Sequence, residues 1–420
     1  MKELSVDVAV IGGGPAGLAA AIEAKDQGAD HVIILERDVE LGGILQQCIH
    51  DGFGLHRFGK RLSGCGYAHH FIESVAEKAI DVKLKTIVLE ITDQKIIYAM
   101  NEVDGMMKIT CGAMILAMGC RERTRSQVFI WGTRPSGVLT AGTVQRYINM
   151  EGYLPGQKAV ILGSGDIGLI MARRMTLEGI EVEGVYEVME SPGGLTRNIS
   201  QCLKDFQIPM HLATTVVRIH GNKKLEGVTV AQVDENRQPI QGTQRFIPCD
   251  LLVLAVGLIP ENELSRQLEV EMDSRTKGPI VDEHFMTSIP GVFAAGNVVT
   301  VFDLVDYVSL TGEIAGRGAA KFIQGKLNLQ MPAKDVLPGD SVNFVVPQRI
   351  RTVNAEDSIP IYFRVKKEMR KVEVTATVDG QVCMRKKHAI ALPPEMMVET
   401  IQLEKIHEDA RELRVSVKVG

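Results

Sequence analysis

The sequence lacks paired cysteines, long apolar runs and an excess of positive charge. Its seven cysteines are an odd number, they are widely spread, and no two have C-x-x-C spacing. This distribution argues against a disulfide framework and against a zinc site. We expect a reduced, cytoplasmic protein with no metal.

The other absences exclude further classes. The longest apolar run, residues 251–260, is about half of the roughly 20 residues that a helix needs to cross a bilayer. The length of the apolar runs therefore predicts no transmembrane segment. The first ten residues lack the zones of a signal peptide. The net charge of -5 gives no basic footprint, so nucleic acid is not an expected partner.

Glycine, in contrast, is abundant and clustered, with 41 glycines in the chain. The length of 420 residues is enough for two or three domains. After the apolar run 5–11 comes a G-x-G-x-x-G pattern at Gly12, Gly14 and Gly17, followed by an Ala-rich helical stretch and a second apolar run, 31–35, that ends on Glu36. The glycines permit a tight turn, close approach of a pyrophosphate and close packing of helix on strand, while the acid can bind ribose hydroxyls. A bare glycine turn without ligand is the alternative.

The same order of elements recurs later. Residues 158–162 form an apolar run, Gly163, Gly165 and Gly168 repeat the pattern with Asp166 and Ile167 inside it, and the following run ends on Glu187. Two such units predict two dinucleotides, or one duplication with an inactive copy. A carboxylate at Glu187 favours NAD(H) over NADP(H), although Arg197 could still reach a 2′-phosphate.

Two fingerprints at this separation resemble the pyridine nucleotide–disulfide reductase superfamily, in which FAD and NAD(P) occupy two Rossmann-like domains. Residues 111–119 resemble the strand that closes the first FAD segment, 251–257 the matching strand of the NAD(P) domain, and 291–297 the late FAD motif. That motif normally ends in Gly-Asp, whereas this chain has Asn297, whose amide can still hydrogen-bond the cofactor. The resemblance implies that helix amides near residues 307–310 face the flavin and stabilise its reduced anion.

The resemblance assigns site residues. The residues expected to hold FAD are Gly12, Gly14, Pro15, Ala16, Gly17, Glu36, Arg37, Gly43, Ile44, Leu45, Val88, Ala117, Gly119, Gly296, Asn297 and Ser309. Those expected to hold NAD are Gly163, Gly165, Asp166, Ile167, Gly168 and Glu187.

The dithiol of the disulfide reductases is missing, because Cys48 stands alone after Gly42-Gly43 and Cys65 approaches it only if the intervening loop folds back. The run 42–54 and the runs 119–123 and 137–145 resemble a narrower group, the FAD/NAD subunits of heteromeric dehydrogenases such as opine oxidase, hydrogen cyanide synthase, archaeal proline dehydrogenase and glycerol-3-phosphate dehydrogenase-associated oxidoreductases. This resemblance implies a partner dehydrogenase flavoprotein or another electron-transfer protein.

Hydride transfer between nicotinamide and flavin needs little from side chains. Cys48 could be an inert buried thiol, a redox-active cysteine, or an electron relay or cofactor contact. His50 could be a proton donor to reduced flavin or a structural residue. We therefore expect an FAD-dependent NAD(P)H oxidoreductase that acts as the electron-exchange subunit of a larger dehydrogenase assembly. The alternatives are a stand-alone NADH oxidase or peroxidase that uses Cys48, and a non-catalytic scaffold stabilised by FAD.

The expected fold class is α/β, with an FAD domain of residues 1–122 and 256–328, an inserted NAD(P) domain of residues 123–255, and a small all-β sandwich of residues 340–420. In the sandwich, Asp379-Gly380 predicts a hairpin turn between two strands. Seven basic residues between 366 and 387 give this region a solvated face or a docking surface for an acidic partner.

Overall fold

The computed structural model describes residues 1–351, 358–407 and 409–420, and they form two compact units. The first unit contains Met1–Cys120 and Pro260–Gly420, and the second is the inserted segment Arg121–Ile259. The second unit therefore interrupts the first. Among the described residues, no helix combines the length and the apolar character that a membrane span requires.

The first unit is built on a sheet that is parallel on one side and antiparallel on the other. Its order is β5 (Asp81–Lys83), β2 (Val32–Leu35), β1 (Lys2–Ile11), β8 (Gly105–Leu116), β7 (Ile96–Asn101) and β6 (Ile87–Ile91), with β20 (Val292–Ala294) also beside β8. β1 is parallel to β2 and β8, whereas β7 is antiparallel to both β8 and β6. All four residues of β2 are buried, as expected for a central parallel strand.

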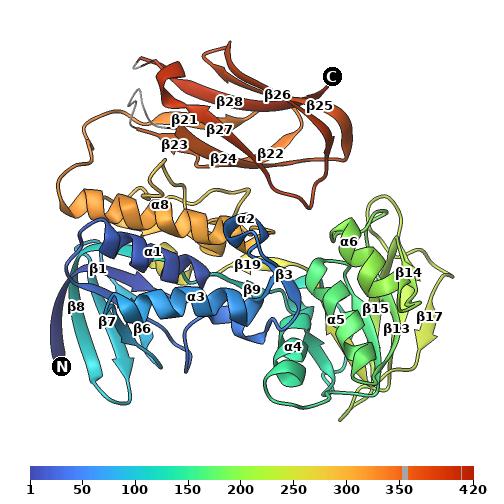
Figure 1. The fold of residues 1–420 in the computed structure, drawn as a ribbon. Coiled ribbons are helices and arrows are strands. Elements are labelled where there is room, and N and C mark those ends of the chain that lie inside the picture. The colour runs from blue at the N-terminus through green and yellow to red at the C-terminus, as the bar shows by residue number, and fades with distance from the viewer. Residues whose placement is uncertain (352–357, 408) are drawn as a thin grey trace. The chain divides into compact units, whose positions relative to one another are not determined.

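The helices of this unit pack on this sheet or on one another. They are α1 (Pro15–Asp26), α2 (Leu55–Phe58), α3 (Gly64–Glu77), α7 (Glu263–Gln267) and α8 (Val305–Ile323), and the short strands β3 (Asp51–Phe53) and β4 (Leu62–Ser63) pair before α3. α1 and α8 lie side by side (Figure 1). A Cβ at Gly312 would lie 2.2 Å from Ala16 O, and one at Gly316 would lie 2.3 Å from Ala20 O. The two glycines therefore allow the close helix contact.

The second unit repeats the parallel part of this design. Its order is β11 (Val138–Thr140), β18 (Leu251–Leu254), β12 (Lys158–Leu162), β13 (Glu181–Tyr186) and β14 (Met210–His211), so the first strand again lies between the second strand and the closing strand. A second sheet contains β10 (Trp131–Gly132), β15 (Thr214–His220), β16 (Gly227–Gln232) and β17 (Arg245–Ile247), and the helices are α4 (Ala141–Asn149), α5 (Asp166–Leu177) and α6 (Thr196–Asn198). β9 (Cys120–Glu122) and β19 (Leu258–Pro260) belong to the two connecting segments. The prediction of two Rossmann-like folds is confirmed.

The last part of the first unit is a sandwich of two sheets that share a core. One has the order β23 (Arg349–Ile350), β21 (Lys334–Pro338), β28 (Glu412–Val419), β25 (Met369–Val378) and β26 (Gln381–Ala391), and the other has β22 (Val342–Val346), β24 (Ser358–Val365) and β27 (Met397–Gln402). The hairpin at Asp379-Gly380 is confirmed, since Val378 pairs with Gln381. β21 and β23 were not predicted, because one lies in a joint rich in Pro and Gly and the other has two residues.

Candidate functional site

The turn after β1 requires two of its glycines for the fold itself. Gly12 has φ +106°, and a Cβ there would lie 2.4 Å from Ala117 O. A Cβ at Gly17 would lie 1.8 Å from Gly12 O. Neither position accepts a side chain without movement of the backbone.

Gly14 is different, because a Cβ there would meet no atom within 4 Å. It is the N-cap residue of α1 with φ -78°, no side chain caps this helix end, and Pro15 opens the first turn. The uncapped helix start therefore faces open space, which suits an anion such as a phosphate. The glycine leaves room for a group other than protein.

An acid and a second glycine loop close around this turn. The Glu36 carboxylate, in a residue that is 7% exposed, accepts from Gly13 N at 2.6 Å and from Asp38 N at 2.8 Å. A carboxylate has about four lone-pair sites, so it keeps capacity for ribose hydroxyls. Gly42 N donates to Gly13 O at 2.8 Å, and a Cβ at Gly43 would lie 3.1 Å from Gly14 Cα.

The turn after β12 has the same geometry. Gly163 has φ +98°, and a Cβ there would lie 2.2 Å from Ala255 O, while a Cβ at Gly168 would lie 2.9 Å from Gly163 O. Gly165 is the N-cap residue of α5, again without a side-chain cap. The nearest atom to a Cβ there would be Ala255 O at 3.8 Å, so this turn also leaves space beside an uncapped helix start.

The second turn is held more firmly than the first. Glu187 accepts from Ser164 N at 2.9 Å, from Ser164 Oγ at 2.6 Å and from Met189 N at 2.9 Å. Ser164 Oγ in turn accepts from Gly193 N at 2.8 Å. Asp166 Oδ1 accepts from Leu195 N at 2.9 Å and also from the Asn198 amide.

The glycine pair Gly193-Gly194 was missed by the sequence interpretation. It follows Glu187 by six and seven residues, as Gly42-Gly43 follows Glu36. This shared spacing is the signal that would have found it.

Of the predicted late FAD residues, Gly296 and Asn297 lie in the segment that leads into α8, and Ser309 lies within α8. Gly296 N donates to Thr311 Oγ1 at 3.0 Å, and Asn297 Oδ1 accepts from Phe302 N at 3.0 Å. Ser309 is fully buried and bonds the Tyr67 hydroxyl at 2.8 Å. Burial raises the pKa of Tyr67, so its hydroxyl stays protonated.

The remaining predicted residues are more scattered. In the first unit, Arg37 forms an ion pair with Glu261 at 3.1 Å, Ile44 is 60% exposed and Leu45 is buried. Val88 pairs with Ala99 on β7, and Gly119 has φ +73°. Val88 packs against the core of the first unit. In the second unit, Ile167 packs on the hydrophobic core. The geometry thus joins each glycine turn to its own acid, Glu36 in the first unit and Glu187 in the second.

Cys48 lies under the second glycine loop. It is 7% exposed, and its thiol donates to Ile44 O at 3.3 Å. The intervening loop does fold back, because Gly64 N donates to Cys48 O at 2.7 Å, yet Cys48 and Cys65 are both free thiols. The His50 ring lies 5.1 Å from the ring of Phe53. Among the described residues, no three His, Cys, Asp or Glu side chains gather in a way that could hold a metal ion.

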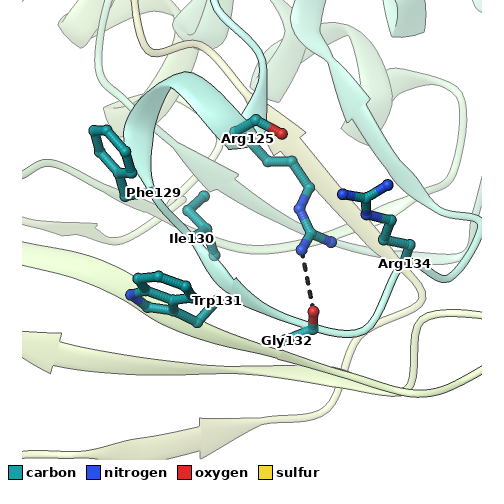
Figure 2. Close-up of a pocket in the computed structure, with 7 residues that line it drawn as sticks. Arg125, Phe129, Ile130, Trp131, Gly132 and Arg134 are labelled. Carbon is teal, nitrogen blue, oxygen red and sulfur yellow. Dashed lines mark hydrogen bonds between the residues drawn. The ribbon is translucent and has the colours of Figure 1, made fainter.

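A cavity of about 240 Å³ lies on the turn that opens the second unit (Figure 2). Phe129 and Trp131 line it and are 76% and 74% exposed, and Phe129 has φ +56°. Arg125 donates to Gly132 O at 3.2 Å and so holds the turn together, while Arg134 also lines the cavity. Glu122 accepts from Gly142 N at 2.8 Å and binds the start of α4.

Comparisons with known proteins agree with this geometry. The family model for pyridine nucleotide-disulphide oxidoreductases matches residues 6–312. The chain is 28% identical to hydrogen cyanide synthase subunit HcnB of Pseudomonas protegens, over 70% of this chain and 66% of that protein. It is 25% identical to an opine oxidase subunit of Agrobacterium tumefaciens, over 75% of this chain and 64% of that protein.

Both matches therefore span just under two thirds of those relatives. Among solved structures, thioredoxin reductase of Lactococcus lactis covers 76% of this chain and 99% of its own, with a TM-score of 0.62 at 22% identity. That likeness concerns the fold.

Proposed function

Because this chain belongs to the pyridine nucleotide-disulphide oxidoreductase family, we propose that it transfers hydride between NADH and FAD as the electron-exchange subunit of a heteromeric dehydrogenase. The family implies FAD and a pyridine nucleotide. The observation that carries the proposal is the pair of turns in which Gly14 and Gly165 leave open space beside an uncapped helix start.

In this proposal the two turns divide the cofactors between the units. FAD would be held by the turn Gly12–Gly17, by Glu36 and by the segment that leads into α8, and the flavin supplies the hydride chemistry when bound. NADH would be held by the turn Gly163–Gly168 and by Glu187. The protein binds and orients the cofactors, and the N-terminus of α8 stabilises negative charge on the reduced flavin.

Glu187 supports NADH as the nucleotide. Its carboxylate is 7% exposed and fixed by contacts to Ser164 and Met189, so it cannot easily turn away. A fixed negative charge favours a free 2′-hydroxyl and repels a 2′-phosphate. Arg197 is exposed on α6, so the carboxylate, rather than the arginine, is the charge fixed at the end of β13.

Two observations support a partner protein. HcnB and the opine oxidase relative are both named as subunits. Phe129 and Trp131 are exposed on a turn fixed by Arg125, and residues 121–136 contain four arginines and one glutamate. Exposed aromatics with arginine are typical of protein interfaces, and the charge favours an acidic partner surface.

Anaerobic titration of the purified protein with NADH tests the proposal. One equivalent of NADH should bleach the flavin absorbance near about 450 nm. The same loss of absorbance should require far more NADPH. Gly165→Ala is the matched control, because it should keep the yellow colour and lose the bleaching. An unbleached flavin in the wild-type protein at saturating NADH contradicts the function and favours a scaffold that merely retains FAD.

A further inference from the structure

Unpaired buried polar atoms gather where α8 begins. Among the described residues, Asp306 Oδ1 and Tyr362 Oη are buried side-chain atoms without a hydrogen-bond partner. Asp306 lies in the first turn of α8, and Tyr362 lies on strand β24 of the sandwich. An unpaired buried polar atom is costly, so this group indicates a polar partner that is not part of the protein.

The strand pattern of β24 explains why Tyr362 points at α8. Ile361 and Phe363 pack in the sandwich core, whereas Tyr362 packs in the core of the FAD domain. The neighbouring strands β22 and β27 supply Val346 and Val398 beside Tyr362. This sheet therefore buries both faces, one in each core, and directs Tyr362 out of the sandwich.

Aromatic contacts place Tyr362 against the start of α8. Its ring centroid lies 5.7 Å from that of Tyr307 and 5.3 Å from that of Phe302, with edge-to-face geometry in both pairs. Tyr362 is fully buried. Its hydroxyl thus ends in the FAD domain rather than in solvent.

Polar contacts fix the same segment from the sandwich side. Arg364 donates to Val301 O at 3.1 Å, and its guanidinium lies 3.8 Å from Asp303. Met396 N donates to Asp303 Oδ2 at 3.0 Å. Since Phe302 N also bonds Asn297, the sandwich and Asn297 together hold residues 297–307.

We propose that the C-terminal sandwich completes the FAD site, with the Tyr362 hydroxyl donating a hydrogen bond to the bound flavin. This inference rests on the proposed assignment of FAD to the first unit. The flavin ring has carbonyl oxygens that accept such a bond. Asp306 Oδ1, as an acceptor, suits an N–H group of the flavin.

The protonation state of Tyr362 agrees with a donor role. Burial raises the pKa of Tyr362, with Tyr307 and Glu313 adding to the effect. The hydroxyl therefore stays neutral and keeps its proton across the physiological range. A donor at this place stabilises negative charge on reduced flavin.

Tyr362→Phe tests the proposal, because it removes one oxygen and keeps the ring contacts. We expect FAD to bind about 3- to 10-fold more weakly, with a shifted flavin absorption band and a more negative midpoint potential. Tyr98→Phe, on β7 of the same unit, is the matched control and should change none of these. The FAD dissociation constant, the spectrum and the potential are measured on the full chain.

The outcomes separate this inference from the proposed function. Wild-type protein that binds no FAD contradicts the proposed function. Wild-type and Tyr362→Phe proteins with equal affinity, spectrum and potential overturn the role of Tyr362 and leave a bound water as the partner of its hydroxyl. If Tyr362→Phe fails to fold, the FAD dissociation rate of Arg364→Lys decides: a faster rate supports completion of the site by the sandwich, and an unchanged rate overturns it.

Discussion

Glu187 and Ser164 are joined twice, since Oε2 of the carboxylate accepts from the Ser164 backbone N–H at 2.9 Å and from its hydroxyl at 2.6 Å. The first turn has Gly13 in the matching place, which gives Glu36 only a backbone contact. Ser164 Oγ also accepts from Gly193 N. One hydroxyl therefore ties the acid of the second unit to its glycine loop.

Removal of that hydroxyl should weaken NADH binding. In Ser164→Ala we expect the dissociation constant for NADH to rise about 2- to 10-fold, because one or two hydrogen bonds that order the acid and the loop are lost. Calorimetry on the oxidised protein measures this effect. The flavin content should not change, and Ser200→Ala, on the same unit, should behave as wild type. An unchanged affinity would show that the hydroxyl does not order the NADH site.

Cys48 should be dispensable for flavin reduction by NADH. Its thiol is buried and donates to a carbonyl, and the cofactors rather than this side chain carry the hydride transfer. In Cys48→Ser we therefore expect the rate of anaerobic flavin bleaching to stay within about twofold of the wild-type rate. Stopped-flow absorbance measures the rate. Loss of NADH-dependent peroxide turnover in this variant, with wild-type turnover present, would instead favour the stand-alone peroxidase.

Asp282 should make stability depend on pH where the sandwich meets the rest of the first unit. It is 2% exposed, and burial followed by the charge of Glu283 raises its pKa. The folded protein then holds a proton that the unfolded chain has released, so stability falls as pH rises from the ordinary carboxyl range towards the raised value.

The comparison is between wild type and Asp282→Asn. The free energy of unfolding of wild type, relative to the variant, should fall by roughly 1–3 kcal/mol between pH 4 and pH 8. Denaturant unfolding at several pH values measures it. A constant difference would mean that the pKa of Asp282 is not raised in the folded protein.

Trp131 should contribute to binding of a partner protein. It is the single tryptophan of the chain and is 74% exposed, and loss of such an aromatic from an interface centre typically costs 2 kcal/mol or more, about 30-fold in affinity. The tagged chain, purified from its own cells, should lose its partner in Trp131→Ala and keep it in Tyr153→Ala, an aromatic that is also exposed. Equal partner content in both variants would place the interface elsewhere.

The sequence predicted what local patterns determine. The apolar runs before each turn, the glycines at fixed offsets and the acids Glu36 and Glu187 all lie within about 30 residues of one another in each unit, so their arrangement follows from strand, turn and helix preferences. The antiparallel sandwich followed in the same way from short alternating runs and the Asp379-Gly380 turn.

Local sequence patterns could not predict contacts between segments that are far apart in the chain. Residues 359, 361, 362 and 363 are all apolar or aromatic, so the sequence does not tell which of them face the sandwich core and which face α8. The approach of Gly64 to Cys48 and the exposure of Phe129 likewise depend on tertiary packing. An exposed Phe with positive φ runs against both burial and backbone preference.

The central claim is that each turn holds its own dinucleotide, and a reciprocal pair of alanine variants tests it most directly. In Gly14→Ala the methyl group meets no atom within 4 Å, and in Gly165→Ala its nearest neighbour is Ala255 O at 3.8 Å, an ordinary contact. Both proteins should therefore fold, as circular dichroism and thermal unfolding would show. We predict that Gly14→Ala loses FAD and still binds NADH in calorimetry, whereas Gly165→Ala retains FAD and no longer binds NADH. Two folded variants that bind both cofactors with wild-type affinity would contradict the account.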